Sequence, residues 1–138
     1  MTAEQGLGRY SFLLIGTTAE TRWPEVLKDA LSPLGELHIA SERETIRAVS
    51  EREYDVILVD AGAIQDLIQM IGRLRSQQPR ARIVVVTASP TWQQSREVFR
   101  AGAADYIRKS LDKGKLRAQI EALLQPLCPP SSETEREQ

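Results

Sequence analysis

The chain has very few of the residues that build reactive or cross-linked sites. Its 138 residues include one cysteine and one histidine. The single cysteine, Cys128, excludes an internal disulfide, a C-x-x-C pair and a zinc cluster, and this usage is typical of a reducing cytoplasm. We interpret His38, the single histidine, as a side chain on an edge strand. A catalytic triad would have no base to use.

The chain also lacks an excess of charge and a long apolar run. Lysine and arginine number 18 against 19 acids, so we expect no general attraction to nucleic acid or to an anionic membrane. No apolar run approaches the roughly 20 residues that span a bilayer, and the N-terminus does not have the pattern of a signal peptide. The length predicts one compact domain.

Short apolar runs alternate with segments of helical period. The runs at 55–60 and 82–87 are apolar almost throughout, as expected for central parallel strands buried on both faces. The predicted strands span 10–15, 36–40, 55–60, 82–87 and 104–108, and the helical segments span 23–34, 41–49, 64–74, 91–101 and 116–124. This alternation predicts βαβ units and an α/β fold.

Two boundary signals refine this prediction. Ser41 and Glu44 have the spacing of a capping box at the start of the second helix. After Gln125 the sequence is rich in proline, serine and charge and cannot bury a core. We therefore predict a folded domain over 8–125 and a flexible tail or interdomain linker over 126–138.

Three polar residues stand at the ends of predicted strands. Asp60, Thr87 and Lys109 each follow an apolar run, and the carboxyl ends of parallel strands meet at the edge where α/β sheets bind ligands. An acid, a hydroxyl and an ammonium together are the groups used by an aspartate that accepts a phosphoryl group. In the alternative, Asp60 is only the N-cap of the helix that begins near Ile64.

The segments DVILVD, IVVVTA and AGAADYIRKS resemble the third-, fourth- and fifth-strand motifs of response-regulator receiver (CheY-like) domains. The resemblance implies a flavodoxin-like three-layer α/β sandwich with a five-stranded parallel sheet of order 2-1-3-4-5. It also implies that Asp60 is the phosphoacceptor, that Thr87 contacts the phosphoryl group, that Tyr106 is a rotating aromatic switch, and that Lys109 pairs with the phosphoryl oxygens.

Receiver domains also carry two adjacent acids after the first strand, which hold Mg²⁺ together with the phosphoacceptor. The matching residues here are Gly16 and Thr17. Because Mg²⁺ is usually held by one or two carboxylates and by substrate oxygens, we expect Asp60 alone to bind it weakly. Loss of the metal would slow phosphoryl transfer by roughly a thousandfold or more. The sequence therefore predicts a degenerate receiver that is not an independent enzyme.

Two alternatives remain open. Glu20 could replace the missing acids as a metal ligand, which would leave Asp60 phosphorylatable. The loop at Thr17 and Thr18 could instead hold the phosphate of FMN, as in flavodoxin-type proteins.

The resemblance also implies partners. These are a sensor histidine kinase and a fused or separate output domain. Basic residues gather in the last third of the chain, on the fourth helix, the fifth strand and the fifth helix, the surface through which receivers dimerise or meet outputs. Arg96, Arg100 and Arg108 are among them, and Trp92 lies at the start of the fourth helix.

Overall fold

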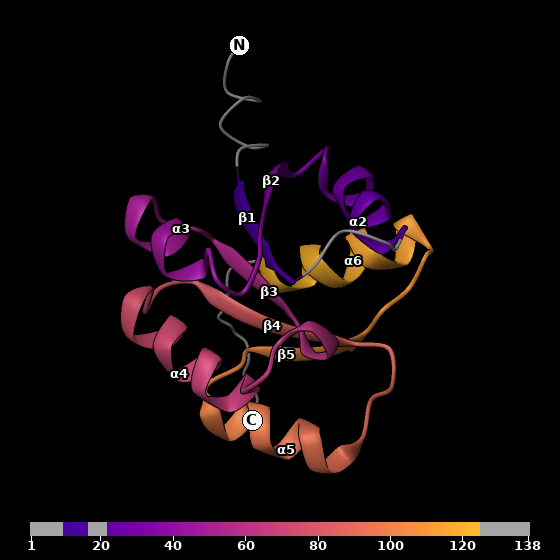
Figure 1. Ribbon diagram of the computed structural model, residues 1–138. Coiled ribbons are helices and arrows are strands. Elements are labelled where there is room, and N and C mark those ends of the chain that lie inside the picture. Colours follow the sequence, from indigo (N-terminus) through magenta and orange to yellow (C-terminus); the bar gives the residue numbers. More distant parts are fainter. Residues whose placement is uncertain (1–9, 17–21, 125–138) are drawn as a thin grey trace, which may run out of the picture.

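Five parallel strands form one sheet in the order β2-β1-β3-β4-β5, as the resemblance implies (Figure 1). The protein is described here by a computed structural model over residues 10–16 and 22–124. The strands are β1 (Tyr10–Ile15), β2 (Gly35–Ala40), β3 (Val56–Asp60), β4 (Arg82–Thr87) and β5 (Asp105–Arg108). Each lies within one residue of its predicted range, because short apolar runs between polar turns define buried strands well.

Helices cover both faces of the sheet, which gives the predicted three layers. One face carries α2 and α6, and the other carries α3, α4 and α5 (Figure 1). The helices are α2 (Trp23–Leu31), α3 (Thr45–Glu51), α4 (Leu67–Gln77), α5 (Trp92–Ala101) and α6 (Lys113–Leu124), and a 3₁₀ turn η1 (Ala61–Ala63) follows β3. In the described residues no helix is long and apolar enough to cross a membrane.

The sheet separates two apolar clusters. Successive side chains of a strand point to opposite faces, so Leu13 and Ile57 pack under α3, α4 and α5, whereas Phe12 and Leu58 pack under α2 and α6. All five residues of β3 are buried. Burial of each large apolar side chain contributes about 1.5–3 kcal/mol, so the central strands hold the carboxyl edge of the sheet in a fixed position.

Local capping explains where the helices differ from prediction. The two reciprocal bonds of the predicted capping box form, since Ser41 N–H donates to Glu44 Oε1 at 2.9 Å and Glu44 N–H donates to Ser41 Oγ at 3.3 Å. They lie in the turn before α3, however, so the prediction that this helix starts near Ser41 is wrong: α3 begins at Thr45 and has no side-chain cap. The prediction that α4 begins near Ile64 is wrong. Asp66 accepts a hydrogen bond from Gln69 N–H at 3.1 Å, so the helix starts one residue after Asp66. The predicted tail at 126–138 lies outside the described residues.

Candidate functional site at the carboxyl edge of the sheet

The structure brings an acid and an ammonium together at the carboxyl edge of the sheet. Asp60 ends β3, and Lys109 directly follows β5. Lys109 Nζ lies 2.7 Å from Asp60 Oδ2, and the two side chains are 23% and 12% exposed. This is a short, partly buried ion pair, of the kind that is stronger than a pair in open solvent.

Both carboxylate oxygens of Asp60 are occupied. Oδ2 pairs with Lys109, and Oδ1 accepts a hydrogen bond from Gly62 N–H at 3.0 Å. Asp60 therefore does cap a helical turn, but the turn is η1 and not the helix near Ile64, because α4 has its own cap. Lys109 Nζ also lies 5.5 Å from the centre of the buried Trp23 ring, a geometry that favours a cation over an aromatic face. The pair is close to neutral without a metal ion.

Gly16 lies directly against Asp60. A Cβ atom added at Gly16 would lie 3.4 Å from Ala63 Cβ and 2.9 Å from Asp60 Cβ, and the second distance is closer than packed carbon atoms tolerate. The space that an acidic side chain would enter at this position is thus already filled. The predicted loop residues Thr17, Thr18 and Glu20 lie outside the described residues. Within 10–16 and 22–124, no group of three His, Cys, Asp or Glu side chains could hold a metal ion.

The hydroxyls of Thr87 and Tyr106 lie in separate hydrogen-bond networks. Thr87 is buried and its Oγ1 accepts from Ser89 N–H at 3.1 Å. Tyr106 Oη accepts from Thr91 N–H at 3.1 Å and donates to Gln94 Oε1 at 2.7 Å. These two hydrogen bonds therefore hold the Tyr106 side chain against the first turn of α5.

Sequence reasoning missed Gln94 as the partner of Tyr106. The available signal was its position three residues after Thr91, whose Oγ1 accepts from Gln94 N–H at 3.1 Å to cap α5. The roles of Asp60, Thr87, Tyr106 and Lys109 in phosphoryl chemistry stay predictions.

Comparison with known proteins identifies the class of this domain. The model of the response regulator receiver domain matches residues 27–121. The chain is 33% identical over 87 residues to the two-component response regulator PhoP of Pseudomonas aeruginosa, a match that covers 62% of this chain and 39% of the relative. It is 35% identical over 77 residues to the transcriptional regulatory protein PhoP of Escherichia coli, covering 55% and 34%.

Solved structures show the same fold. A response regulator from Thermotoga maritima superposes with a TM-score of 0.75 at 21% identity and covers 84% of this chain and 98% of that one. The orphan response regulator HP1043 of H. pylori has a TM-score of 0.74 at 23% identity, with 86% and 98% covered.

The chain belongs to the response regulator receiver family of two-component signalling systems. The matched region spans well under half the length of the two PhoP relatives.

Proposed function

We propose that this receiver domain is a phosphate-independent interaction module, in which the Asp60–Lys109 ion pair replaces the metal-bound phosphoryl group. The observation that carries the proposal is the 2.7 Å contact between Lys109 Nζ and Asp60 Oδ2. A phosphoryl acceptor needs a free carboxylate oxygen and cations for the equatorial oxygens of the transferred group. Here the cation is already bound to the acceptor.

Gly16 supports the same proposal. Its missing side chain lets Asp60 Cβ pack where a second carboxylate would otherwise stand. Two nearby carboxylates repel each other and create the demand for a divalent cation. Among the described residues the site holds one acid and one lysine, so it has no such demand. We therefore propose that the domain binds Mg²⁺ weakly at best, uses no other cofactor and is not an independent enzyme.

The proposed docking surface consists of α5, β5 and α6. Trp92 is 63% exposed and Phe99 is 45% exposed, and the Arg96 guanidinium lies 5.3 Å from the centre of the Trp92 ring. Tryptophan and arginine are the residues that most often carry binding energy at interfaces. Because Tyr106 is bonded to Thr91 and Gln94 at the start of α5, a partner that moves this helix would also move Tyr106.

The partners that we propose are those of two-component systems: a sensor histidine kinase, or an output domain that is fused or separate, working in the cytoplasm. A homodimer through the same docking surface is the second form of this proposal. The relatives named PhoP are described as regulatory proteins of transcription or of two-component systems, which supports an output domain as a partner.

Tryptophan fluorescence tests the proposal. Trp23 packs over Lys109 and Trp92 begins the docking helix, so both report on the site. Mg²⁺ and then beryllium fluoride, which mimics a phosphoryl group on aspartate, are titrated into the protein and into the Asp60→Asn variant. We expect no saturable change in either protein. A saturable change that disappears in the variant would show a working phosphoacceptor, with Glu20 as the candidate metal ligand.

A further inference from the structure

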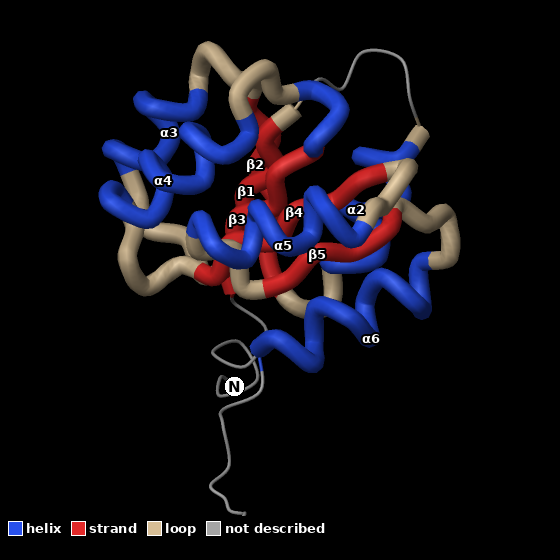
Figure 2. Tube along the Cα trace, turned by 90° about the horizontal axis from the view of Figure 1, so that it is seen from below, coloured by secondary structure: helices blue, strands red, loops and turns tan. Residues whose placement is uncertain are grey.

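The two edges of the sheet differ in how they are protected. Figures 1 and 2 show β2 at one side of the sheet and β5 at the other. Edge strands usually avoid pairing with another chain by being short or by carrying lysine, proline or a bulge. The edge strand β5 has four residues and begins and ends with a charge. In contrast, β2 (GELHIA) pairs with β1 along all six residues without a bulge, and it contains neither lysine nor proline.

Among the described residues, the backbone of β2 has a strand partner on one side only, where it pairs with β1. Tyr10 N–H donates to Leu34 O at 3.1 Å and Gly16 N–H donates to Ala40 O at 3.0 Å. Bonding alternates every second residue in a parallel ladder, so the even-numbered residues of β2 face β1. The N–H and C=O groups of Gly35, Leu37 and Ile39 therefore point outward from the sheet.

Helices leave this edge accessible. A groove of about 730 Å³ lies between β2 and α3, with His38, Ile39 and Ala40 on one side. Ile39 is 40% exposed, and the Glu36 side chain is 71% exposed. Gly35 and Ala40, at the two ends of β2, are buried, whereas Glu36 and Ile39 between them are exposed. An incoming strand could thus reach the outer side of β2 in the middle of the strand.

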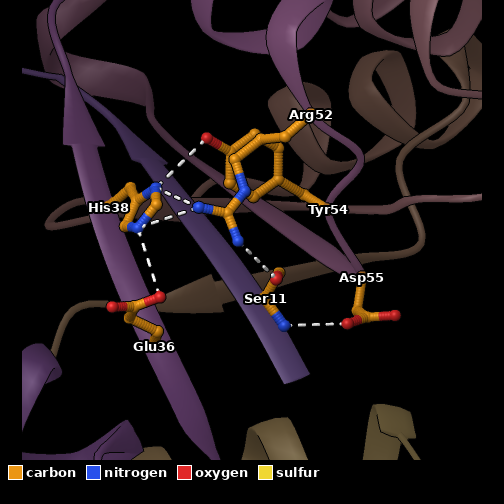
Figure 3. Close-up of polar contacts among 6 residues, drawn as sticks. All are labelled: Ser11, Glu36, His38, Arg52, Tyr54 and Asp55. Carbon is orange, nitrogen blue, oxygen red and sulfur yellow. Dashed lines mark hydrogen bonds and ion pairs between the residues drawn. The ribbon is translucent and has the colours of Figure 1, made fainter. Parts of the chain in front are cut away.

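A charged cluster marks one face of this edge (Figure 3). Glu36 Oε1 lies 3.5 Å from His38 Nε2 on the same strand. Arg52 Nη1 lies 3.3 Å and 3.2 Å from the two ring nitrogens of His38, and Arg52 Nη2 donates to Ser11 Oγ at 3.3 Å. Within the described residues no carboxylate forms an ion pair with Arg52. A cation is therefore fixed at the edge with room for an acidic partner.

We propose that two copies of this chain pair through β2 as antiparallel strands, with Leu37 opposite Leu37 of the second copy. In this register the two Leu37 residues form both of their outward backbone hydrogen bonds with each other. Each Gly35 does the same with the Ile39 that lies opposite it. Glu36 then stands opposite His38 of the second copy, and its carboxylate also comes near the Arg52 that contacts that His38. The exposed Ile39 then lies next to Gly35 of the second copy, which is buried and has no side chain to obstruct it.

The sequence of β2 selects this register among the two-fold arrangements. A two-fold axis at Glu36 would place the two Glu36 carboxylates directly opposite each other, and like charges opposite each other destabilise a strand pair. An axis at His38 would place the two imidazoles, each beside an Arg52, opposite each other. Only the axis at Leu37 pairs an acid with the basic cluster on both sides.

Sedimentation velocity over a range of protein concentrations tests the proposal. We expect a monomer–dimer equilibrium with a Kd on the order of 10 μM, as suits a small interface. Glu36→Lys should weaken dimerisation at least about tenfold, because it places an ammonium group near the Arg52 guanidinium of the second copy. The double variant Glu36→Lys/His38→Glu restores opposite charges in the same register and should recover to within about threefold.

A proline variant of Ile39 distinguishes the contribution of backbone hydrogen bonds to the dimer from that of side-chain contacts. Ile39→Pro removes an outward N–H and leaves the bonds to β1 intact, so it should weaken the dimer about tenfold or more. Ile39→Thr also removes the apolar side chain but keeps the N–H, and it should weaken the dimer less. Circular dichroism shows whether each variant is folded, and the Glu36 pair of variants tests the same edge without proline.

Amide hydrogen exchange gives a second readout that depends on geometry alone. The amides of Leu37 and Ile39 should become protected as the protein concentration rises, whereas those of Glu36 and His38 should be protected at every concentration. A protein that stays monomeric up to several hundred μM (about thirtyfold above the expected Kd) would overturn the proposal. So would a dimer that Trp92→Ala abolishes and Glu36→Lys leaves unchanged, because that dimer would use the α5 surface.

Discussion

The two halves of the carboxyl edge of the sheet use their polar groups in different ways. In the half formed by β3, β4 and β5, Asp60 and Lys109 neutralise each other at 2.7 Å. In the half formed by β1 and β2, Gly16 follows β1 and packs against Asp60, and the Glu44 carboxylate accepts from Ser41 N–H in the turn before α3. The first half brings together two residues of the predicted phosphoryl site, Asp60 and Lys109, whereas in the second half Glu44 bonds to backbone and Gly16 provides close packing. Glycine at position 16 thus affects the packing next to Asp60 as well as the charge there.

Substitution of Gly16 by an acid would make the two halves more alike, and it should have the largest effect on the stability of the protein. We expect Gly16→Asp to lower the free energy of unfolding by about 3 kcal/mol, because the new Cβ would lie 2.9 Å from Asp60 Cβ and the new carboxylate would face a second acid. Urea denaturation at pH 7 measures the loss. Gly16→Ala is the matched control without the charge, because it adds the same Cβ atom at the same backbone φ of +158°, and it should cost about half as much.

Mg²⁺ extends the same experiment. If Gly16→Asp were as stable as the parent protein and gained stability from Mg²⁺, the two halves would differ only by one missing acid. A loss that Mg²⁺ does not reverse would show that the packing around Asp60 has adapted to glycine.

Removal of the Lys109 ammonium group tests the half formed by β3, β4 and β5. Lys109→Met keeps the length of the side chain but leaves the Asp60 carboxylate, 12% exposed, without its cation. We expect a loss of about 2 kcal/mol, between the values for exposed and for buried pairs. The double variant Lys109→Met/Asp60→Asn should recover most of this loss, because the amide carries no charge. A single variant as stable as the parent would mean that solvent already screens the pair.

The sequence patterns predicted the strands of the sheet more accurately than the contacts around Asp60. Strands such as 82–87 are apolar runs whose burial follows from composition, and β4 occupies the predicted residues. The contact between Asp60 and Lys109 was also within reach, because both follow strands that end at one edge. The start of α4 could not be predicted in this way, because Asp60 and Asp66 are both good N-cap residues. In the structure Asp60 caps the turn η1 and Asp66 caps α4. Packing of Gly16 against Asp60 depends on distances that no local pattern encodes.

Tyr106 links the polar half of the edge to the docking helix, and its removal should have a smaller effect. Tyr106→Phe keeps the ring but loses the bonds to Thr91 N–H and Gln94 Oε1. We expect a loss of about 1 kcal/mol, the usual net value of such bonds. A double-mutant cycle with Gln94→Ala measures the coupling. Equal losses in the parent and in Gln94→Ala would show that the 2.7 Å contact contributes nothing.

Acid titration should give the smallest effect and tests the half formed by β1 and β2. The hydrogen bonds from the Ser41 backbone and side chain lower the pKa of Glu44 below its ordinary value of 4.5. Folding thus favours the charged carboxylate, so its stabilisation is present above pH 4.5 and is lost as the pH falls through the lowered pKa. Glu44→Gln keeps an acceptor for Ser41 N–H without the charge. We expect the parent to have the higher urea midpoint at neutral pH and this difference to vanish in acid. A difference that stays constant with pH would mean that Glu44 stabilises the turn before α3 without its charge.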